Sequence, residues 1–501
     1  MEEVERRKQA ISDKIMSWLS NKWNFYFLII LIFAIVLRIW VFYITKNQPL
    51  WWDEADYMTK AKAVAFDTPL TGWNSAREVV APFIWGFFFM LTKSEILARL
   101  LQIAISAGIV ILIYLFGKKV FNEKVGLIGA FISAVSAMFL FYTGRLLTYM
   151  WAPFFFLLTF YLFWEAYYEN KGRIYTILAP ISGAVGIAVY GSMFFGIAAL
   201  GLFLFLTEGY KFLLKKKIWI MAVIGVIALL PNLIYFYFLT GDPFIRWHYG
   251  VRTATSPDWS FLFGYIKLFP HLFGTIFTIL ISLSFLYVLF ESAISFDLVI
   301  KANDKEKGKN PILFLVLWAV IVIGFYTWIA LTTKTVWESF IFSAFPALFL
   351  IVGVTLDSLY KIKIKKAYVT IGIILLLAAG GYAQISYAND IIKSKVDSYG
   401  QIREAGEWLK LNTPKDATIY TTSVPQLTYY SERATVRIPN NASDMDAINI
   451  SGSSYYMFSV FERQSELDWM LKYPQEKNYT AVAAFYFDAQ KKQLAAVIFK
   501  M

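Results

Sequence analysis

Three acids stand directly behind two tryptophans in the run Trp51-Trp52-Asp53-Glu54-Ala55-Asp56-Tyr57. Indole side chains favour the boundary between membrane and water, where their ring faces and N–H groups are both satisfied. We therefore expect Asp53, Glu54 and Asp56 just outside the hydrocarbon core. A carboxylate there loses part of its hydration and becomes a stronger base. This segment is predicted to be the active site, and the predicted chemistry is proton transfer.

Two roles are open to such a carboxylate. It takes a proton from an acceptor hydroxyl, or it stabilises positive charge that develops on a sugar. The sequence does not choose between Asp53 and Glu54 as the base. A structural alternative is that Asp53 only N-caps a helix that begins at Glu54, which stabilises a helix by about 1 kcal/mol. Capping and catalysis are compatible, because a cap fixes its side chain.

In membrane proteins, Lys and Arg are usually more frequent in cytoplasmic loops than in external ones. Cations in predicted external loops or at outer helix ends are therefore candidates for binding a phosphate. The residues of this kind are Arg77, Arg145, Arg246, Arg252 and Lys334. For each arginine alone, headgroup contact or a solvated loop is the competing explanation. Arg145 is the strongest candidate, because it lies between two predicted spans without a long loop.

Aromatic and cationic side chains meet again in the loop from Gly241 to Trp259, which contains Arg246-Trp247-His248-Tyr249. Such a loop binds a sugar phosphate between ring faces and cations. The residues predicted to contact the sugar or the acceptor are Trp52, Asp56, Tyr57, His248 and Trp337.

The composition indicates that membrane-spanning helices position these acids and cations. The chain of 501 residues is 58% hydrophobic and only 16% charged, so it is predicted to be a polytopic membrane protein. It has no cysteine, and only two histidines, which excludes thiolate chemistry and a multi-histidine metal site. The net charge of +12 is carried by lysine clusters between apolar runs, typical of cytoplasmic loops rather than of nucleic-acid binding.

Eleven apolar runs are long enough to be read as membrane spans. They are 25–45, 96–116, 125–141, 151–168, 174–190, 193–207, 218–239, 261–290, 312–331, 338–356 and 368–387. The lysine-rich connectors place the N-terminus on the cytoplasmic side of the cell membrane. An odd number of spans then places the C-terminus outside.

The predicted domains are a cytoplasmic N-terminus at 1–24, a transmembrane domain at 25–387 with its first external loop at 46–81, and an external α/β domain at 388–501. In the loop, Met58 and Ala61 have helical spacing that fits a helix lying in the membrane interface. The apolar run Pro82–Thr92 is too short to span and is predicted to be interfacial or re-entrant.

The last 114 residues have the composition of an ordinary soluble domain. A helix is expected at 399–411 and strands at 417–421, 480–487 and 494–499. Three glycosylation sequons begin at Asn441, Asn449 and Asn478, which gives weak support to an external location.

The ordered set of motifs resembles the GT-C glycosyltransferases of the protein O-mannosyltransferase and aminoarabinose transferase type. The motifs are Asp53-Glu54, Pro82 with its apolar run, Ser94-Glu95-Ile96-Leu97-Ala98-Arg99-Leu100, Gly117-Lys118-Lys119-Val120-Phe121, Arg145-Leu146-Leu147-Thr148, Phe345-Pro346-Ala347-Leu348, Glu407-Trp408-Leu409-Lys410, Thr413-Pro414-Lys415-Asp416-Ala417 and Tyr429-Tyr430-Ser431. Each motif alone is degenerate, and only their order is specific.

The resemblance implies transfer of one sugar, a hexose or pentose, from a polyprenyl-phosphate donor to a lipid, glycan or protein acceptor, with inversion. It implies Asp53 as base with support from Glu54, and Arg145 and Lys334 near the donor phosphate. The outward cations Arg246 and Arg77 are predicted to bind the same phosphate. Two departures matter: the chain reads Thr148-Tyr149-Met150 where many members have a second acid, and Val80-Ala81-Pro82 where they have His-Pro-Pro. The missing acid weakens the case for a divalent metal, and no cofactor is firmly expected.

Other classes of protein share parts of this pattern. A lipid or solute transporter or flippase is also polytopic, but here the spans carry few central charges, and no internal repeat is visible. An inactive relative that binds a partner through its tail is a third alternative. An oligosaccharyltransferase is less favoured, because the tail has no Trp-Trp-Asp-Tyr-Gly motif.

Overall fold

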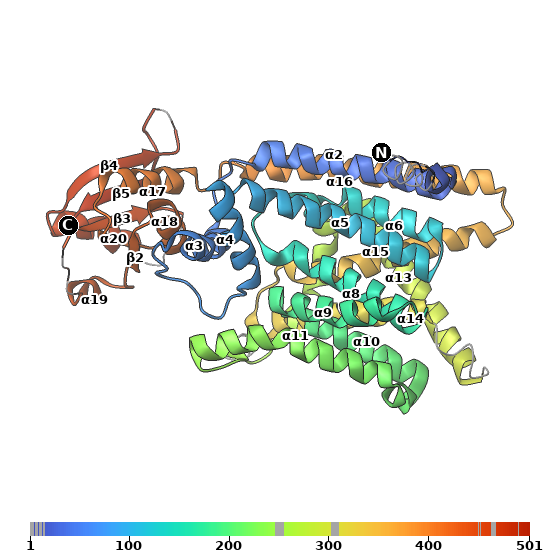
Figure 1. Cartoon of the computed structure of the whole chain (residues 1–501). Coiled ribbons are helices and arrows are strands. Elements are labelled where there is room, and N and C mark those ends of the chain that lie inside the picture. Colours follow the sequence, from blue (N-terminus) through green and yellow to red (C-terminus); the bar gives the residue numbers. More distant parts are fainter. Residues whose placement is uncertain are drawn as a thin grey trace. The chain divides into compact units, whose positions relative to one another are not determined.

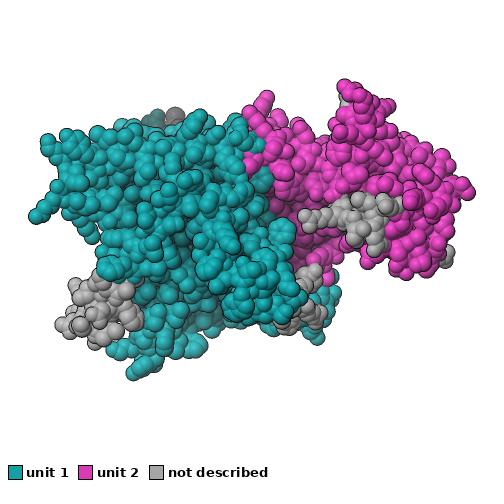
Figure 2. All heavy atoms as spheres, turned by 180° about the vertical axis from the view of Figure 1, so that it is seen from behind, with its two compact units in different colours: residues 1–41, 102–143, 148–390 teal, residues 42–101, 144–147, 391–501 magenta. Residues whose placement is uncertain are grey.

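In a computed structural model of the chain, the described residues are 5, 9, 13, 16–245, 255–301, 310–448, 450, 452–461, 467–488 and 490–501, with backbone alone for 292–301, 467 and 468. The chain divides into two compact units (Figure 2). Unit 1 comprises residues 1–41, 102–143 and 148–390, and unit 2 comprises 42–101, 144–147 and 391–501.

Long apolar helices make up unit 1 (Figure 1). The helices that lie wholly or mainly in unit 1 are α2 (Lys22–Thr45), α5 (Ile96–Val120), α6 (Glu123–Val135), α7 (Ala137–Thr143), α8 (Trp151–Tyr167), α9 (Arg173–Val189), α10 (Met193–Glu208), α11 (Lys216–Thr240), α13 (Gly264–Lys301), α14 (Pro311–Thr333), α15 (Phe345–Ser358) and α16 (Lys366–Lys395). Two further helices, α3 (Trp52–Phe66) and α4 (Val80–Thr92), belong to unit 2. Within unit 1, α8 packs on α9, α9 on α11, α10 on α14, and α6 on α15.

Eight helical segments in the described residues are long and apolar enough to cross a membrane, and the bent pair α6–α7 raises this number to nine. The chain is therefore a multi-pass membrane protein, as predicted. Two of the eleven predicted spans correspond to α8 and α9, which have only 17 residues each. Each predicted span nevertheless coincides with a helical segment.

The α6–α7 pair bends by 56° at Ser136, and backbone groups at the bend are hydrogen-bonded by side chains within unit 1. Arg38 of α2 is fully buried and donates to the carbonyl oxygens of Ala134 at 3.1 Å and Ser133 at 3.4 Å. The Gln384 side chain accepts the N–H of Ala137 at 2.9 Å. Because hydrocarbon offers no hydrogen-bonding partner, such internal bonds are required wherever a helix breaks inside a membrane.

Unit 2 contains a five-stranded sheet with the order β2-β1-β3-β5-β4 (Figure 1). Its elements are α17 (Gly400–Asn412), β1 (Thr418–Thr421), α18 (Val424–Ser431), β2 (Ala434–Arg437), α19 (Ala442–Asp446), β3 (Ser454–Ser459), α20 (Leu467–Glu476), β4 (Thr480–Tyr486) and β5 (Leu494–Lys500). β1 is parallel to β2 and β3, pairing Ile419 with Tyr455, whereas β5 is antiparallel to β3 and β4. The predicted helix and all three predicted strands are present.

Helices α3 and α4 belong to unit 2 together with this sheet. Met58 and Ala61 of α3 are fully buried, because α3 packs against α4 and α18. A Cβ atom on Gly86 of α4 would lie 2.9 Å from the Ala61 carbonyl oxygen, so only glycine permits this approach. The predicted helix exists, but its apolar residues contact protein rather than forming a face free to lie on the membrane.

Candidate active site

The first turn of α3 carries the three acids. Its N-cap is Trp51, and the side chain of Glu54 at N3 accepts the Trp51 N–H at 3.0 Å. Acids in a first turn also interact favourably with the positive end of the helix dipole. Asp53 lies inside the helix, whose N-cap is Trp51, so the alternative that Asp53 N-caps a helix starting at Glu54 is wrong.

Glu54 lies in a closed cluster. Its side chain is fully buried, and its Oε1 accepts the N–H of Leu146 at 2.7 Å. Its Oε2 lies 3.2 Å from Nη1 of Arg145, whose guanidinium carbon stacks 3.7 Å from the centre of the Trp51 ring. Both carboxylate oxygens are thus engaged. This arrangement holds the start of α3 against the short segment 144–147.

Asp53 and Asp56 lie on another side of the same turn and share one cation. Arg77 forms ion pairs with Asp53 through Nη2 and with Asp56 through Nε. The Asp53 side chain remains 39% exposed, whereas that of Asp56 is only 5% exposed. Of the three acids, Asp53 is therefore the one that a substrate can approach.

The buried partner Asp56 is electrostatically unusual. Burial raises the pKa of Asp56 to about 6, against the opposing effect of the Arg77 charge. Burial alone would lower the pKa of Arg77, but Tyr57, Asp53 and Asp56 together raise it, so the guanidinium stays charged. Tyr57 is aligned by Glu78, which accepts its hydroxyl at 2.6 Å, and its ring lies 5.1 Å from the guanidinium carbon.

Further polar residues fix the backbone around the acids. Arg99 donates to the carbonyl oxygens of Gly144 at 3.2 Å and Gln48 at 3.1 Å, and is itself held by Glu95 at 2.6 Å. The hydroxyl of Tyr430 accepts the N–H of Leu50 at 2.8 Å. No site role was predicted for these residues, although Arg99 and Tyr430 stand inside motifs that carried the resemblance.

The remaining predicted residues are distributed as follows. Trp52 lies in the first turn of α3 and is partly exposed. Lys334 ends α14 in a left-handed conformation, φ 56°, with an exposed side chain, and Trp337 follows with 59% exposure; both belong to unit 1. Arg246 and His248 lie outside the described residues. The structure thus brings together Asp53, Asp56, Tyr57 and Arg77, and separately Glu54 and Arg145.

A metal has no evident place among these acids. The Arg77 guanidinium stands between Asp53 and Asp56, where a shared cation would bind. Over the part of the chain that the structure describes, no three His, Asp or Glu side chains are grouped to hold a metal ion.

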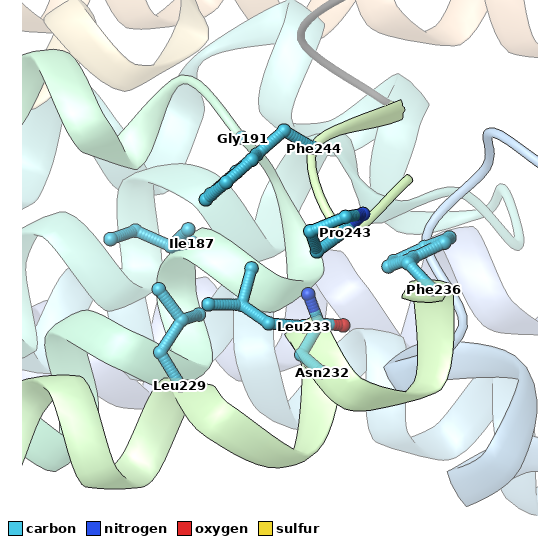
Figure 3. A pocket seen from close by; sticks show the side chains of 8 residues that line it. All are labelled: Ile187, Gly191, Leu229, Asn232, Leu233, Phe236, Pro243 and Phe244. Atoms are coloured by element: carbon cyan, nitrogen blue, oxygen red, sulfur yellow. The ribbon is translucent and has the colours of Figure 1, made fainter. Parts of the chain in front are cut away.

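A small pocket in unit 1 lies beside the start of the loop at 241–259 (Figure 3). Leu229, Asn232 and Phe236 of α11 line it together with Pro243 and Phe244. Its volume of about 20 Å³ accommodates little more than one water molecule. The pocket is too small for a sugar.

Known proteins resemble the chain in part of its sequence and in its fold. Residues 77–235 match the family described as dolichyl-phosphate-mannose-protein mannosyltransferase. The match includes Arg77 and Arg145 and begins after the three acids. No curated protein matches significantly.

Solved structures match over nearly the whole chain. The archaeal oligosaccharyltransferase AglB from Archaeoglobus fulgidus, in complex with an inhibitory peptide and a dolichol-phosphate, is 12% identical with a TM-score of 0.61, covering 95% of this chain and 74% of that one. ArnT from Cupriavidus metallidurans, bound to undecaprenyl phosphate, is 12% identical with a TM-score of 0.67, covering 94% and 97%. At these identities the likeness establishes the fold. The predicted GT-C fold is confirmed.

Proposed function

We propose that this GT-C mannosyltransferase-like membrane protein transfers a single sugar from a polyprenyl-phosphate donor to an acceptor hydroxyl, with Asp53 as the base. The observation that carries the assignment is the exposure of Asp53 beside the buried Asp56 and Glu54. The similarity of residues 77–235 to a mannosyltransferase family supports the reaction class. The fold shared with proteins bound to dolichol-phosphate or undecaprenyl phosphate supports the donor class.

The choice between the two candidate bases rests on access. A general base must come within hydrogen-bond reach of the proton that it takes. Glu54 is fully buried, and its oxygens already accept from the backbone and from Arg145. Asp53 offers an exposed carboxylate whose orientation is fixed by Arg77. We assign catalysis to Asp53, and the positioning of α3 to Glu54.

The reaction is an inverting displacement. The acceptor hydroxyl gives its proton to the Asp53 carboxylate as its oxygen bonds to the anomeric carbon of the sugar. The bond from that carbon to the phosphate oxygen breaks, and the electron pair leaves with the polyprenyl phosphate. Asp53 then releases its proton to water. Asp56 and Arg77 keep the Asp53 side chain at the position where the hydroxyl approaches.

Charge that grows on the leaving phosphate must be stabilised. Four cations are proposed to contribute: Arg77, Arg145, Lys334 and Arg246. Arg77 has 20% of its side chain exposed, and Lys334 is exposed at a helix end. Arg145 is buried against Glu54, which favours a long-range electrostatic effect over direct contact. Sugar or acceptor contacts are proposed for Trp52, His248 and Trp337. Asp56 and Tyr57, which were predicted as further contacts, are buried, so the role proposed for them is to hold Arg77 beside Asp53.

The acceptor is a lipid, a glycan or a protein on the outer face of the cell membrane. In this proposal the N-terminus is cytoplasmic, and the domain from residue 388 is outside. That orientation rests on the lysine-rich connectors of the sequence.

The test is transfer by the purified full-length protein from a panel of labelled polyprenyl-phosphate sugars to membrane extracts of the source organism. The variants are Asp53→Asn and the matched control Asp67→Asn, which changes an exposed acid at the other end of α3. We expect transfer by the wild type and by Asp67→Asn, and a loss of at least 100-fold in Asp53→Asn with donor binding retained. Transfer by Asp53→Asn at the wild-type rate would refute the base assignment. Lipid movement across vesicles without transfer would favour the transporter alternative.

A further inference from the structure

A polar cavity lies in unit 2, and none of the acids of α3 lines it. Its volume is about 370 Å³, within the range of about 300–1,000 Å³ that small-molecule pockets occupy. Residues 46–48, the junction of α4 with α5, and side chains from α3, α17 and α18 form its wall. All of these belong to the same compact unit.

Positive charge dominates this cavity. The lining cations are Lys46, Lys62, Lys93, Arg403 and Lys410, and the lining acids are Glu95 and Glu407. Both acids are already engaged: Glu407 accepts from Arg403 at 2.8 Å, and Glu95 pairs with Arg99 at 2.6 Å while accepting the Tyr429 hydroxyl at 2.7 Å. The wall therefore has an excess of positive charge that its own acids do not neutralise.

Two of the lysines compete for one acceptor. Lys62 and Lys410 lie 3.0 and 2.7 Å from the same oxygen of Glu432. Lys62 has only 15% of its side chain exposed and also lies 4.1 Å from the centre of the Tyr429 ring. Burial lowers the pKa of Lys62, and the charge of Glu432 opposes this only in part. A second anion would stabilise the charged ammonium group of Lys62 and so offset the cost of its burial.

Two further lysines of the cavity wall, Lys46 and Lys93, are exposed to solvent. Among the residues that the structure describes, neither has a carboxylate within ion-pair distance. Lys93 is the left-handed C-cap of α4, and Lys46 lies 4.9 Å from the Tyr43 ring. Both ammonium groups are thus available to an incoming anion.

Exposed apolar side chains occur at the end of α4 and at the start of α5. Ile96 lines the cavity and is 44% exposed at the start of α5, a candidate membrane span. Met90 and Leu91 at the end of the apolar helix α4 are 51% and 61% exposed. Cations beside exposed apolar residues at the end of a span fit a lipid, whose phosphate is linked through glycerol to its acyl chains. A free phosphate would not need these apolar side chains.

We propose that this cavity binds the phosphate headgroup of an anionic membrane lipid, with Lys46 and Lys93 closing over it. The site is distinct from the acids at the start of α3, and the inference does not rest on the proposed transferase activity. Bound lipid would anchor the junction of α4 and α5 to α17 and α18 within unit 2.

The test is native mass spectrometry of the full-length protein in detergent, titrated separately with phosphatidylglycerol and phosphatidylcholine. The variants are Lys46→Gln/Lys93→Gln, the charge-preserving Lys46→Arg/Lys93→Arg, and a control with two exposed lysines elsewhere in unit 2, Lys415→Gln/Lys472→Gln. We expect the wild type to bind one phosphatidylglycerol at least ten-fold more tightly than phosphatidylcholine. The glutamine pair at Lys46 and Lys93 should lose this preference, while the other two variants keep it.

Three results would overturn the proposal. The wild type could bind both lipids equally, or the glutamine pair could keep the preference. Inorganic phosphate at millimolar concentration could displace phosphatidylglycerol, which would assign the cavity to a soluble phosphate instead. Because both lysines are exposed, the unfolding temperature should be unchanged in the glutamine pair, so that lost binding reports on the site and not on folding.

Discussion

Glu54 and Arg145 form an ion pair with both side chains inside unit 2, where they are 0% and 2% exposed and Oε2 lies 3.2 Å from Nη1. The pair is completed by the Leu146 N–H on one side and by the Trp51 ring on the other. Burying two charges is costly, and such a pair persists only when its hydrogen-bonding groups are satisfied. Its place at the first turn of α3 ties the orientation of the neighbouring Asp53 to a distant part of the chain.

Removing one partner of this pair should be strongly destabilising. Glu54→Gln leaves the Arg145 charge buried without its counter-ion, and we expect a loss of about 3–5 kcal/mol in the free energy of unfolding. The double variant Glu54→Gln/Arg145→Met should lose less than the sum of the single variants. The matched control is Glu407→Gln, which breaks the exposed pair with Arg403 and should cost about 0–1 kcal/mol.

Chemical unfolding of the purified protein in detergent, followed by tryptophan fluorescence, measures these differences. Equal losses in Glu54→Gln and Glu407→Gln would contradict a special role for the buried pair. A second readout separates positioning from catalysis. Glu54→Gln molecules that remain folded should keep a measurable rate of sugar transfer, whereas Asp53→Asn molecules should not.

Asp56 should make stability depend on pH. Burial raises its pKa from 3.8 to about 6, so the folded state holds a proton that the unfolded state has released over this interval. The free energy of unfolding therefore falls as pH rises through this window, by on the order of 3 kcal/mol. Asp56→Asn cannot ionise and should remove this part of the slope. Unfolding from pH 4 to 7, with Asp67→Asn as control, measures it, and an unchanged slope in Asp56→Asn would be the contrary result.

The sequence predicted which types of side chain form the site, but it did not predict which of them form ion pairs with one another. Asp53, Asp56 and Tyr57 lie in one local run, so their types and helical spacing could be read directly. The partner of Glu54 is 91 residues away, and no local pattern indicates which of several cations reaches it. Arg145 and Arg77 were expected near a phosphate. The sequence shows that these external residues are cations, but it does not show which carboxylate each of them pairs with in the fold.

Apolar patterns have a similar limit. Met58 and Ala61 fit an interfacial helix and a helix buried under protein equally well, since both environments select the same side chains. The spans were predicted because a run of about twenty consecutive apolar residues is typical of a transmembrane helix and rare in other parts of proteins. The bend at Ser136 was not predicted, because its stabilising partners Arg38 and Gln384 are remote in sequence.

Gly72 should not tolerate a side chain. It has φ +76°, and a Cβ atom there would lie 2.2 Å from Cγ1 of Val424, a stiff β-branched neighbour. Gly72→Ala combines backbone strain with this clash, and we expect a loss of about 2–4 kcal/mol. Gly452 has a similar φ of +71°, but a Cβ atom there would meet no atom of the described residues within 4 Å, so Gly452→Ala carries strain alone, about 1 kcal/mol. Unfolding midpoints distinguish the two, and equal losses would argue against the clash.

Arg38 should be essential for the bent helix pair. Its guanidinium donates to Ser106 Oγ at 2.9 Å and to backbone carbonyl oxygens of α2 and α6, all within unit 1. Arg38→Met keeps the volume roughly but leaves the carbonyl oxygens of Ala134 and Ser133 without this donor at about 1–3 kcal/mol each, so we expect a loss of about 2–6 kcal/mol. The control Arg173→Met changes an exposed arginine at the start of α9 and should cost less than about 0.5 kcal/mol. Unfolding in detergent measures both losses; similar small values would mean that water or lipid replaces the guanidinium at the break.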